Sequence, residues 1–404
     1  MSPKTKKPTS PESKSDALST DEAPRGRWRL VRLTLMWLLV AVIGFAAAGM
    51  IYQELGARND RKTFPPPGEL ITVDGVTMHI DCRGEGEPTV VLDAGAGGWS
   101  IHWFALHDQL AAHVRTCAFD RAGVGWSESR PGPTDGVTLS AHAHALFEVA
   151  GLREPVVYVG HSLGANLAQL YAAAHPDHVA GLVLVDPGRP VDMLEDFEGT
   201  AEDAAAIESC GWTCGVGSAV ARLGLMRLIM GGYESRHFDD ATTRRYRAGM
   251  TRPESVATIA SYLKFLPRTA HQLMDLSSSD YGNVPLVVLY SEKTRRPEGE
   301  ETDADVADWH QAVLSDMAEL AAQSSRGRGP IVVPDATHTS VVLAEDAVAQ
   351  VLGEIVAVLD EVRAIGSGDS DIEPAGGEPL DSALDSELKE LENAEGASSE
   401  DAES

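Results

Sequence analysis

Short apolar runs that alternate with helical stretches set the strongest constraint on the fold of this chain. Each run has the length and the uniform apolar character of a strand buried on both faces. These runs lie at 114–120, 156–161, 181–186, 285–290 and 330–335. The helical stretches between and after them lie at 139–150, 163–174, 303–323 and 344–363. Such alternation predicts a mainly parallel sheet with helices on both faces.

The flanks of this pattern add three strands and one long insertion. Residues 69–82 read as two strands joined at Asp74-Gly75, a dipeptide that tolerates the positive φ of a tight hairpin turn. A third strand follows at 88–95. The interval of about one hundred residues at 187–284 has helical character. Because connections in compact α/β units are far shorter, we expect this interval to form a helical cap.

The amino-terminal part carries a run of about 20 uncharged, mostly apolar residues from Leu33 to Tyr52. That length suits a helix that crosses a bilayer, so we expect a transmembrane helix at 33–52 and a linker at 53–68. The basic segment 1–32 predicts a disordered, cytoplasmic amino end and an extracytoplasmic remainder at the cell membrane. The alternative is a cleaved secretory signal, for which the alanines at 46–48 offer a cleavage site. Both alternatives export the same domain.

Acidic residues dominate the charge of the chain. The sequence has 33 Lys and Arg against 61 Asp and Glu, a formal net charge of −28. Much of the excess lies in residues 364–404, which we expect to be a disordered acidic tail. Nucleic acid is excluded as a partner because phosphate backbones require a basic surface.

The segment Gly160-His161-Ser162-Leu163-Gly164 carries the strongest chemical signal. It matches the G-x-S-x-G pattern and lies between an apolar strand and a helix, where a sharp turn exposes the serine hydroxyl. We therefore expect Ser162 to be a nucleophile. Its oxyanion would be held by two backbone N–H groups, from Leu163 and from Ala96 in the glycine-rich segment 94–98.

A serine hydroxyl needs a base, and a histidine base is oriented by an acid. His338 follows the last predicted strand and precedes the last helix, which makes it the candidate base. Asp186 ends the strand at 181–186 and is the favoured acid. The alternatives follow the strand at 285–290: Glu292 above all, and also Glu298 and Glu300. The remaining histidines lack the acid spacing of a metal site.

Five motifs resemble, in this order, those of the α/β-hydrolase family over about residues 69–363. They lie at 94–98, 119–127, 159–164, 182–187 and 336–338. The resemblance implies an eight-stranded sheet of order 1-2-4-3-5-6-7-8, no cofactor and, usually, ester hydrolysis. Two departures stand out. The first loop lacks a His-Gly pair, and the strand before Ser291 lacks the usual following Asp. Haloalkane dehalogenases and some lipases carry their acid at the position that matches Asp186, but dehalogenases and epoxide hydrolases use an aspartate nucleophile, which disfavours those two activities.

The four cysteines acquire meaning from this resemblance. If the second and fourth strands are neighbours, as the family implies, Cys82 and Cys117 lie within disulfide distance. Cys210 and Cys214 would form a second pair in the cap. The alternatives are four thiols or another of the three possible pairings.

These observations favour a membrane-anchored serine hydrolase that cleaves apolar small-molecule esters through Ser162, His338 and Asp186, with an acyl-enzyme intermediate. One alternative keeps these residues but cleaves an amide, a thioester or a carbon–carbon bond. The other is a catalytically silent envelope protein that recruits a partner.

Overall fold

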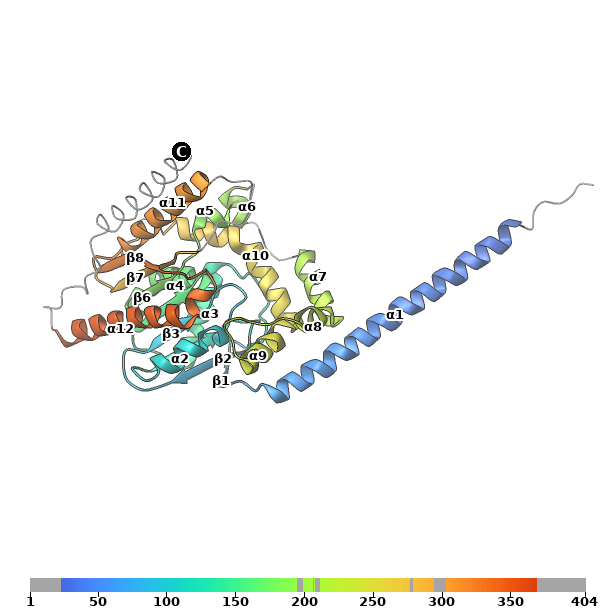
Figure 1. The fold of residues 1–404 in the computed structure, drawn as a ribbon, viewed down its shortest axis with the longest axis horizontal. Helices are drawn as coiled ribbons and strands as arrows, with labels where there is room; N and C mark the ends of the chain where they lie inside the picture. Colours follow the sequence, from blue (N-terminus) through green and yellow to red (C-terminus); the bar gives the residue numbers. More distant parts are fainter. Residues whose placement is uncertain are drawn as a thin grey trace, which may run out of the picture.

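Eight strands form one sheet at the centre of the protein (Figure 1). The computed structural model describes residues 23–368 except 195–198, 206, 208–210, 277–278 and 294–302. The strand order is β1-β2-β4-β3-β5-β6-β7-β8, which confirms the predicted number and order. The β1–β2 and β2–β4 pairs are antiparallel, and the other five pairs are parallel.

The strands fall close to the apolar runs of the sequence. Their bounds are β1 Glu69–Val73, β2 Val76–Arg83, β3 Val90–Asp93, β4 Thr116–Asp120, β5 Val156–His161, β6 Val179–Val185, β7 Leu286–Ser291 and β8 Gly327–Val333. Every residue of β3, β4, β5 and β7 is buried. Uniform burial explains why these strands show no alternation of apolar and polar residues.

Helices cover both faces of the sheet. Their bounds are α2 Phe104–Leu110, α3 Gly136–Val149, α4 Leu163–Ala174, α11 Asp303–Ala321 and α12 Glu345–Ser367. One core joins the sheet to α3, α4 and α11 through side chains such as Phe147, Tyr171 and Met317. The other core joins it to α2 and α12 through side chains such as Leu106 and Ile355. The two cores together hold the carboxyl ends of the strands in place.

The interval between β6 and β7 is helical in its described part, which confirms the predicted cap. Its helices are α5 Pro190–Met193, α6 Ala201–Ala205, α7 Gly211–Arg222, α8 Leu225–Met230, α9 Asp240–Met250 and α10 Pro253–Met274. In Figure 1, α7 and α8 lie on the side of the domain that faces α1.

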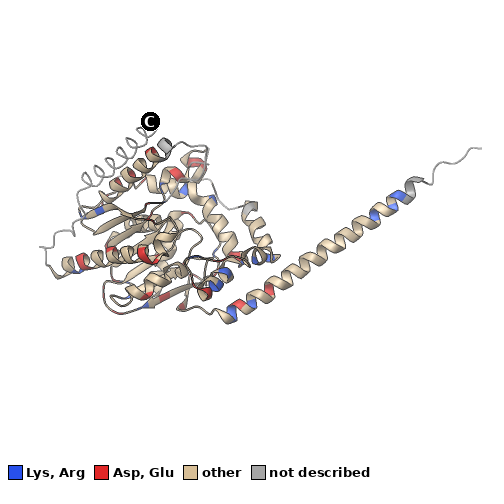
Figure 2. Cartoon of the chain, viewed as in Figure 1, with Lys and Arg blue, Asp and Glu red and all other residues tan. Residues whose placement is uncertain are grey.

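The amino-terminal helix α1 runs from Ala23 to Thr63 and is longer than predicted. It includes residues 53–63, which we expected in a linker. By length and composition, the segment from Arg27 to Thr63 is apolar enough to cross a membrane. Figure 2 shows the uncharged middle of this helix between basic residues at its outer end and charged residues near the domain. The turns beyond residue 52 pack on the cap, where Gln53 and Asp60 contact Arg227. The helix also includes residues 23–32, which we expected to be disordered.

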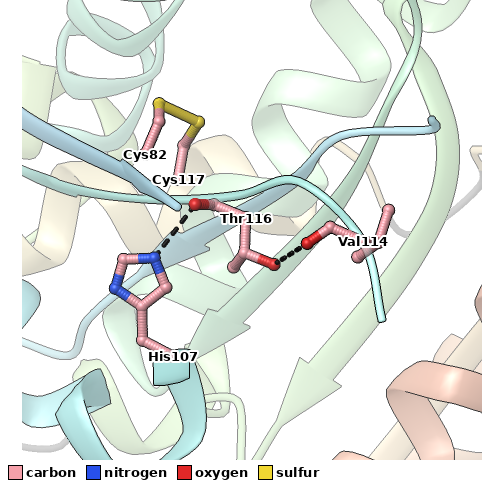
Figure 3. The surroundings of a disulfide bond; sticks show 5 residues. All are labelled: Cys82, His107, Val114, Thr116 and Cys117. Carbon is pink, nitrogen blue, oxygen red and sulfur yellow. Dashed lines mark hydrogen bonds between the residues drawn. A yellow bond between two sulfur atoms is a disulfide. The ribbon is translucent and has the colours of Figure 1, made fainter. Parts of the chain in front are cut away.

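A disulfide joins Cys82 and Cys117, as predicted, with an S–S distance of 2.08 Å (Figure 3). The two cysteines lie directly opposite each other on β2 and β4. Next to them, the His107 ring Nε2 lies 2.9 Å from the carbonyl of Thr116 (Figure 3). The bridge therefore fastens the antiparallel edge of the sheet. The second predicted pair includes Cys210, which lies outside the described residues.

Replacing both Cys82 and Cys117 by Ala should lower the free energy of unfolding. The disulfide closes a loop with a sequence separation of 35, for which chain entropy predicts a loss of about 3 to 4 kcal/mol. Urea unfolding of the full chain in detergent, without reductant, measures this change. An unchanged unfolding midpoint would show that the bridge contributes nothing to stability.

Candidate active site

Ser162 lies in a sharp turn between β5 and α4. Its backbone has φ 54° and ψ −122°, a conformation that side chains with a Cβ rarely adopt. The flanking glycines permit a very close approach of the two elements. A Cβ on Gly160 would lie 2.3 Å from the Gly164 carbonyl oxygen, and a Cβ on Gly164 would lie 2.3 Å from the Asp93 carbonyl oxygen. The glycines of the motif are therefore required by packing around the serine.

His338 lies on the segment between β8 and α12 and contacts Ser162 directly. Its Nε2 atom is 2.8 Å from the Ser162 Oγ atom. Its Nδ1 atom is 2.7 Å from the Oδ2 atom of Asp186. With Nδ1–H donating to the carboxylate, Nε2 is free to accept the serine proton, which is the arrangement a general base requires.

Asp186 follows β6 and has a buried carboxylate, with the side chain 2% exposed. Besides His338, it accepts a hydrogen bond from the Ser291 hydroxyl at 2.7 Å and one from the Ser291 backbone N–H at 3.2 Å. Ser291 ends β7, the neighbouring strand. These contacts hold the carboxylate in one orientation toward the imidazole.

Glu292, the alternative acid, faces another group. Its Oε2 atom accepts a hydrogen bond of 2.6 Å from the backbone N–H of Asp335, three residues before His338. The structure thus brings Ser162, His338 and Asp186 together, while Glu292 supports the segment that carries the histidine. Glu298 and Glu300 lie outside the described residues.

His161 contributes a contact that the sequence analysis missed. Its ring Nε2–H donates a hydrogen bond of 2.7 Å to the backbone carbonyl of His338. Burial, together with the neighbouring His338 ring, lowers the pKa of His161 to about 3. The ring is therefore neutral at pH 7, where it positions the His338 backbone. The only sequence signal for this contact was the position of His161 directly before Ser162 in the motif.

The two predicted oxyanion donors lie on segments that border Ser162. Leu163 is the first residue of α4, so its N–H has no acceptor within the helix. Ala96 lies in a turn that is closed by a 3.0 Å hydrogen bond from the Gly98 N–H to the Gly95 carbonyl. Gly97 has φ 73°, which suits the third position of a type II turn. A Cβ on Gly95 would lie 3.1 Å from the Ser162 Cβ, so this turn packs against the serine.

A buried arginine supports that turn. The Arg121 guanidinium donates to the carbonyl oxygens of Ala94 and Gly95 at 2.5 and 2.6 Å and pairs with the carboxylate of Asp93. Burial works against the charge of Arg121, but the Asp93 carboxylate raises its pKa above the ordinary value. Tyr158 also donates to Asp93 at 3.1 Å. Through Arg121, the motif at 119–127 thus anchors the turn that holds Ala96.

Apolar side chains from the cap lie over this region. A cluster joins Leu163 and Leu167 of α4 to Tyr262 and Ile259 of α10. A Cβ on Gly97 would contact Ile259 at 3.4 Å, so the cap reaches the turn at 95–98. Among the described residues, no group of three or more His, Cys, Asp and Glu is arranged to hold a metal ion. The site thus brings a serine, a histidine and a buried aspartate into hydrogen-bond contact beside apolar side chains, an arrangement that could support nucleophilic catalysis.

Comparisons with known proteins agree with this architecture. Residues 88–207 match the family model described as the alpha/beta hydrolase fold. The uncharacterised protein YbdG of Bacillus subtilis is 22% identical over 165 residues, which cover 40% of this chain and 51% of YbdG. The chain thus spans about half the length of YbdG and a smaller share of two other uncharacterised relatives.

Two solved structures share the fold at low identity. The epoxide hydrolase CorEH is 17% identical with a TM-score of 0.54, and the match covers 73% of this chain and 99% of CorEH. The enol-lactonase of Burkholderia xenovorans is 20% identical with a TM-score of 0.50, and the match covers 72% of this chain and 100% of the lactonase. The strand order, the matched segment and these structures together identify the chain as a protein of the α/β-hydrolase fold.

Proposed function

We propose that this protein is a membrane-anchored serine hydrolase that cleaves carboxylic esters. The observation that carries the proposal is the continuous relay from the Asp186 carboxylate through His338 to the Ser162 hydroxyl, with contacts of 2.7 and 2.8 Å. Side chains in this order at the carboxyl edge of a parallel sheet perform acyl transfer.

The reaction begins when the Ser162 Oγ atom attacks the ester carbonyl carbon while His338 Nε2 takes its proton. The Leu163 and Ala96 N–H groups stabilise the oxyanion of the tetrahedral intermediate. His338 then returns the proton to the departing alcohol, and the acyl group remains as an ester on Ser162. His338 then takes a proton from water, which attacks the acyl-enzyme carbonyl, and returns that proton to the departing Ser162 Oγ atom as the acid is released. Asp186 stabilises the imidazolium in both halves of the cycle.

The membrane anchor is the second part of the proposal. Helix α1 exposes apolar side chains along residues 28–45, among them Trp37 and Phe45 at 64% and 81% exposure. A bilayer would cover this surface. The basic residues before the uncharged run at 33–52 favour a cytoplasmic amino end, which places the hydrolase domain of residues 69–363 and the tail 364–404 outside the cytoplasm.

The apolar surroundings of the site favour an ester with an apolar acyl or alcohol group. Leu163, Ile259 and Tyr262 belong to the cluster beside the serine. An amide or a thioester would use the same relay, and a comparison of p-nitrophenyl esters with the matching anilides and thioesters separates these substrates. A catalytically silent protein would hydrolyse none of them.

Replacing Ser162 by Ala should abolish both ester hydrolysis and labelling by a fluorophosphonate, because the reagent reacts with an activated serine hydroxyl. The matched control is Ser325→Ala. Ser325 is exposed and precedes β8, so it lies at the end of the strands opposite to Ser162. Its hydroxyl donates a hydrogen bond to the Gly282 carbonyl. We expect this control to keep full activity. Labelling that persists in Ser162→Ala would refute the assignment of the nucleophile.

Replacing Asp186 by Asn should lower kcat by roughly 10³- to 10⁴-fold, because the amide cannot orient and stabilise the imidazolium in the same way. Glu292→Gln should stay within about tenfold of the wild type, since the contact of Glu292 is with the Asp335 backbone. Steady-state kinetics on one activated ester measure both effects. The assignment of the acid fails if Asp186→Asn is nearly as active as the wild type.

A further inference from the structure

The cap presents an apolar face that the described chain leaves uncovered. On α7, Trp212 and Val216 are 78% and 51% exposed. On α8, Leu225, Leu228 and Ile229 are 44%, 64% and 67% exposed. Spacings of three and four residues place the side chains of each helix on one face. We call these five residues the cap face.

Helix α1 packs on the cap beside this face. Residues 28–45 of α1 are exposed, and burial begins only beyond them, with Gln53 5% exposed. A Cβ on Gly49 would lie 2.3 Å from the carbonyl oxygen of Leu223. One on Gly224 would lie 2.9 Å from the Tyr52 ring. The backbones of α1 and of the α7–α8 turn are therefore in direct contact, which requires glycine on both sides.

Polar contacts secure the same junction one turn farther along α1. The Gln53 side chain donates to the Thr251 carbonyl at 2.9 Å and accepts from the Arg227 guanidinium at 3.2 Å. Arg227 also pairs with Asp60 at 2.7 Å. These contacts join α1 to α8 and to the end of α9. The direction of α1 in the membrane therefore also determines how the cap is oriented relative to the membrane.

The position along α1 of the contact between Gly49 and Leu223 shows where the cap face lies relative to the membrane. The uncharged run of α1 ends near Tyr52, and Gly49 lies about 4.5 Å inside it at 1.5 Å per residue. Helix α8 begins at Leu225, directly after the turn that touches Gly49, and is only about 9 Å long. Leu228 and Ile229 must therefore lie close to the plane where α1 leaves the bilayer. In Figure 1, α7 and α8 lie on the side of the domain that faces α1.

The charge of the segment 211–233, which contains α7 and α8, also suits a lipid surface. Residues 211–233 contain no Asp or Glu, although the whole chain has 61 of them. Their two charged residues are Arg222 and Arg227. In Figure 2, α7 is drawn almost entirely in the colour of uncharged residues. Anionic headgroups attract such a segment, whereas they repel the acidic remainder of the protein.

We propose that the cap face inserts its apolar side chains into the interface of the lipid bilayer that α1 spans. The inference rests on the proposed membrane anchor and adds a second, shallow contact to it. Together, α1 and the cap face would fix the orientation of the domain over the membrane, with the cap on the lipid side. A substrate partitioned in the outer leaflet would then meet the cap directly.

Environment-sensitive fluorophores on single added cysteines test this contact in the full chain. The protein is reconstituted in phosphatidylcholine–phosphatidylglycerol vesicles after labelling of Leu228→Cys or Ile229→Cys. Phe45→Cys in α1 is the control for lipid contact, and Val149→Cys, 55% exposed on α3, is the control for an apolar position in water. Among the described residues no cysteine is a free thiol, and the chain without an added cysteine, treated with the same reagent, measures any background labelling.

We expect brominated phospholipid to quench the fluorophore at 228 and 229, as it does at 45, and aqueous iodide to quench only the fluorophore at 149. The inference is overturned if positions 228 and 229 respond to iodide like 149 while 45 responds to lipid. It is also overturned if neither quencher reaches 228 and 229, because a second protein copy would then cover the face. Failure of lipid quenching at 45 refutes the anchor itself, and the inference with it.

Discussion

The sharp turn at Ser162 is the constraint around which the domain is arranged. A residue held at φ 54° and ψ −122° costs about 1 to 3 kcal/mol and persists only where the surrounding structure enforces it. Here β5 is paired on both sides by β3 and β6, and α4 is buried along nearly its whole length. The gap between α4 and the sheet admits no side chain at Gly160 or Gly164. The turn therefore keeps the Ser162 hydroxyl at the carboxyl edge of the sheet.

The parallel strands bring the other groups to that same edge. Asp186 follows β6, His338 follows β8, and Ala96 lies beyond β3. Although Ser162 and His338 are 176 residues apart in the chain, their side chains meet at 2.8 Å. Buried contacts then hold two of these segments. Arg121 donates to the Ala94 carbonyl at the start of the turn that contains Ala96, and His161 donates to the backbone carbonyl of His338. The contacts among Ser162, His338 and Asp186 depend on the sheet order, which in turn depends on the apolar strands.

Much of this arrangement was predictable because it has local signals. The apolar runs and the Asp74-Gly75 turn mark the strands and the first hairpin, and the G-x-S-x-G segment marks the serine turn. The choice between Asp186 and Glu292 was open because both follow neighbouring parallel strands, β6 and β7, and only side-chain geometry separates them.

The features that the sequence analysis missed are contacts between distant segments. Nothing near Arg121 in the chain indicates that its guanidinium binds the carbonyls of residues 94 and 95. Likewise, the extension of α1 to Thr63 depends on Gln53 and Asp60 meeting Arg227 of the cap. Pairings of this kind leave no periodic pattern, because each depends on how two separately formed elements pack.

Mass spectrometry of a trapped covalent intermediate tests whether Ser162 is the nucleophile. A p-nitrophenyl carbamate should transfer its carbamoyl group to the nucleophile and release p-nitrophenol, leaving a serine carbamate that water cleaves slowly. Peptide mapping of the quenched full chain is predicted to find the added mass on Ser162 in stoichiometric amount. Release of p-nitrophenol with no adduct on Ser162, or with the adduct on another residue, would contradict this role of Ser162.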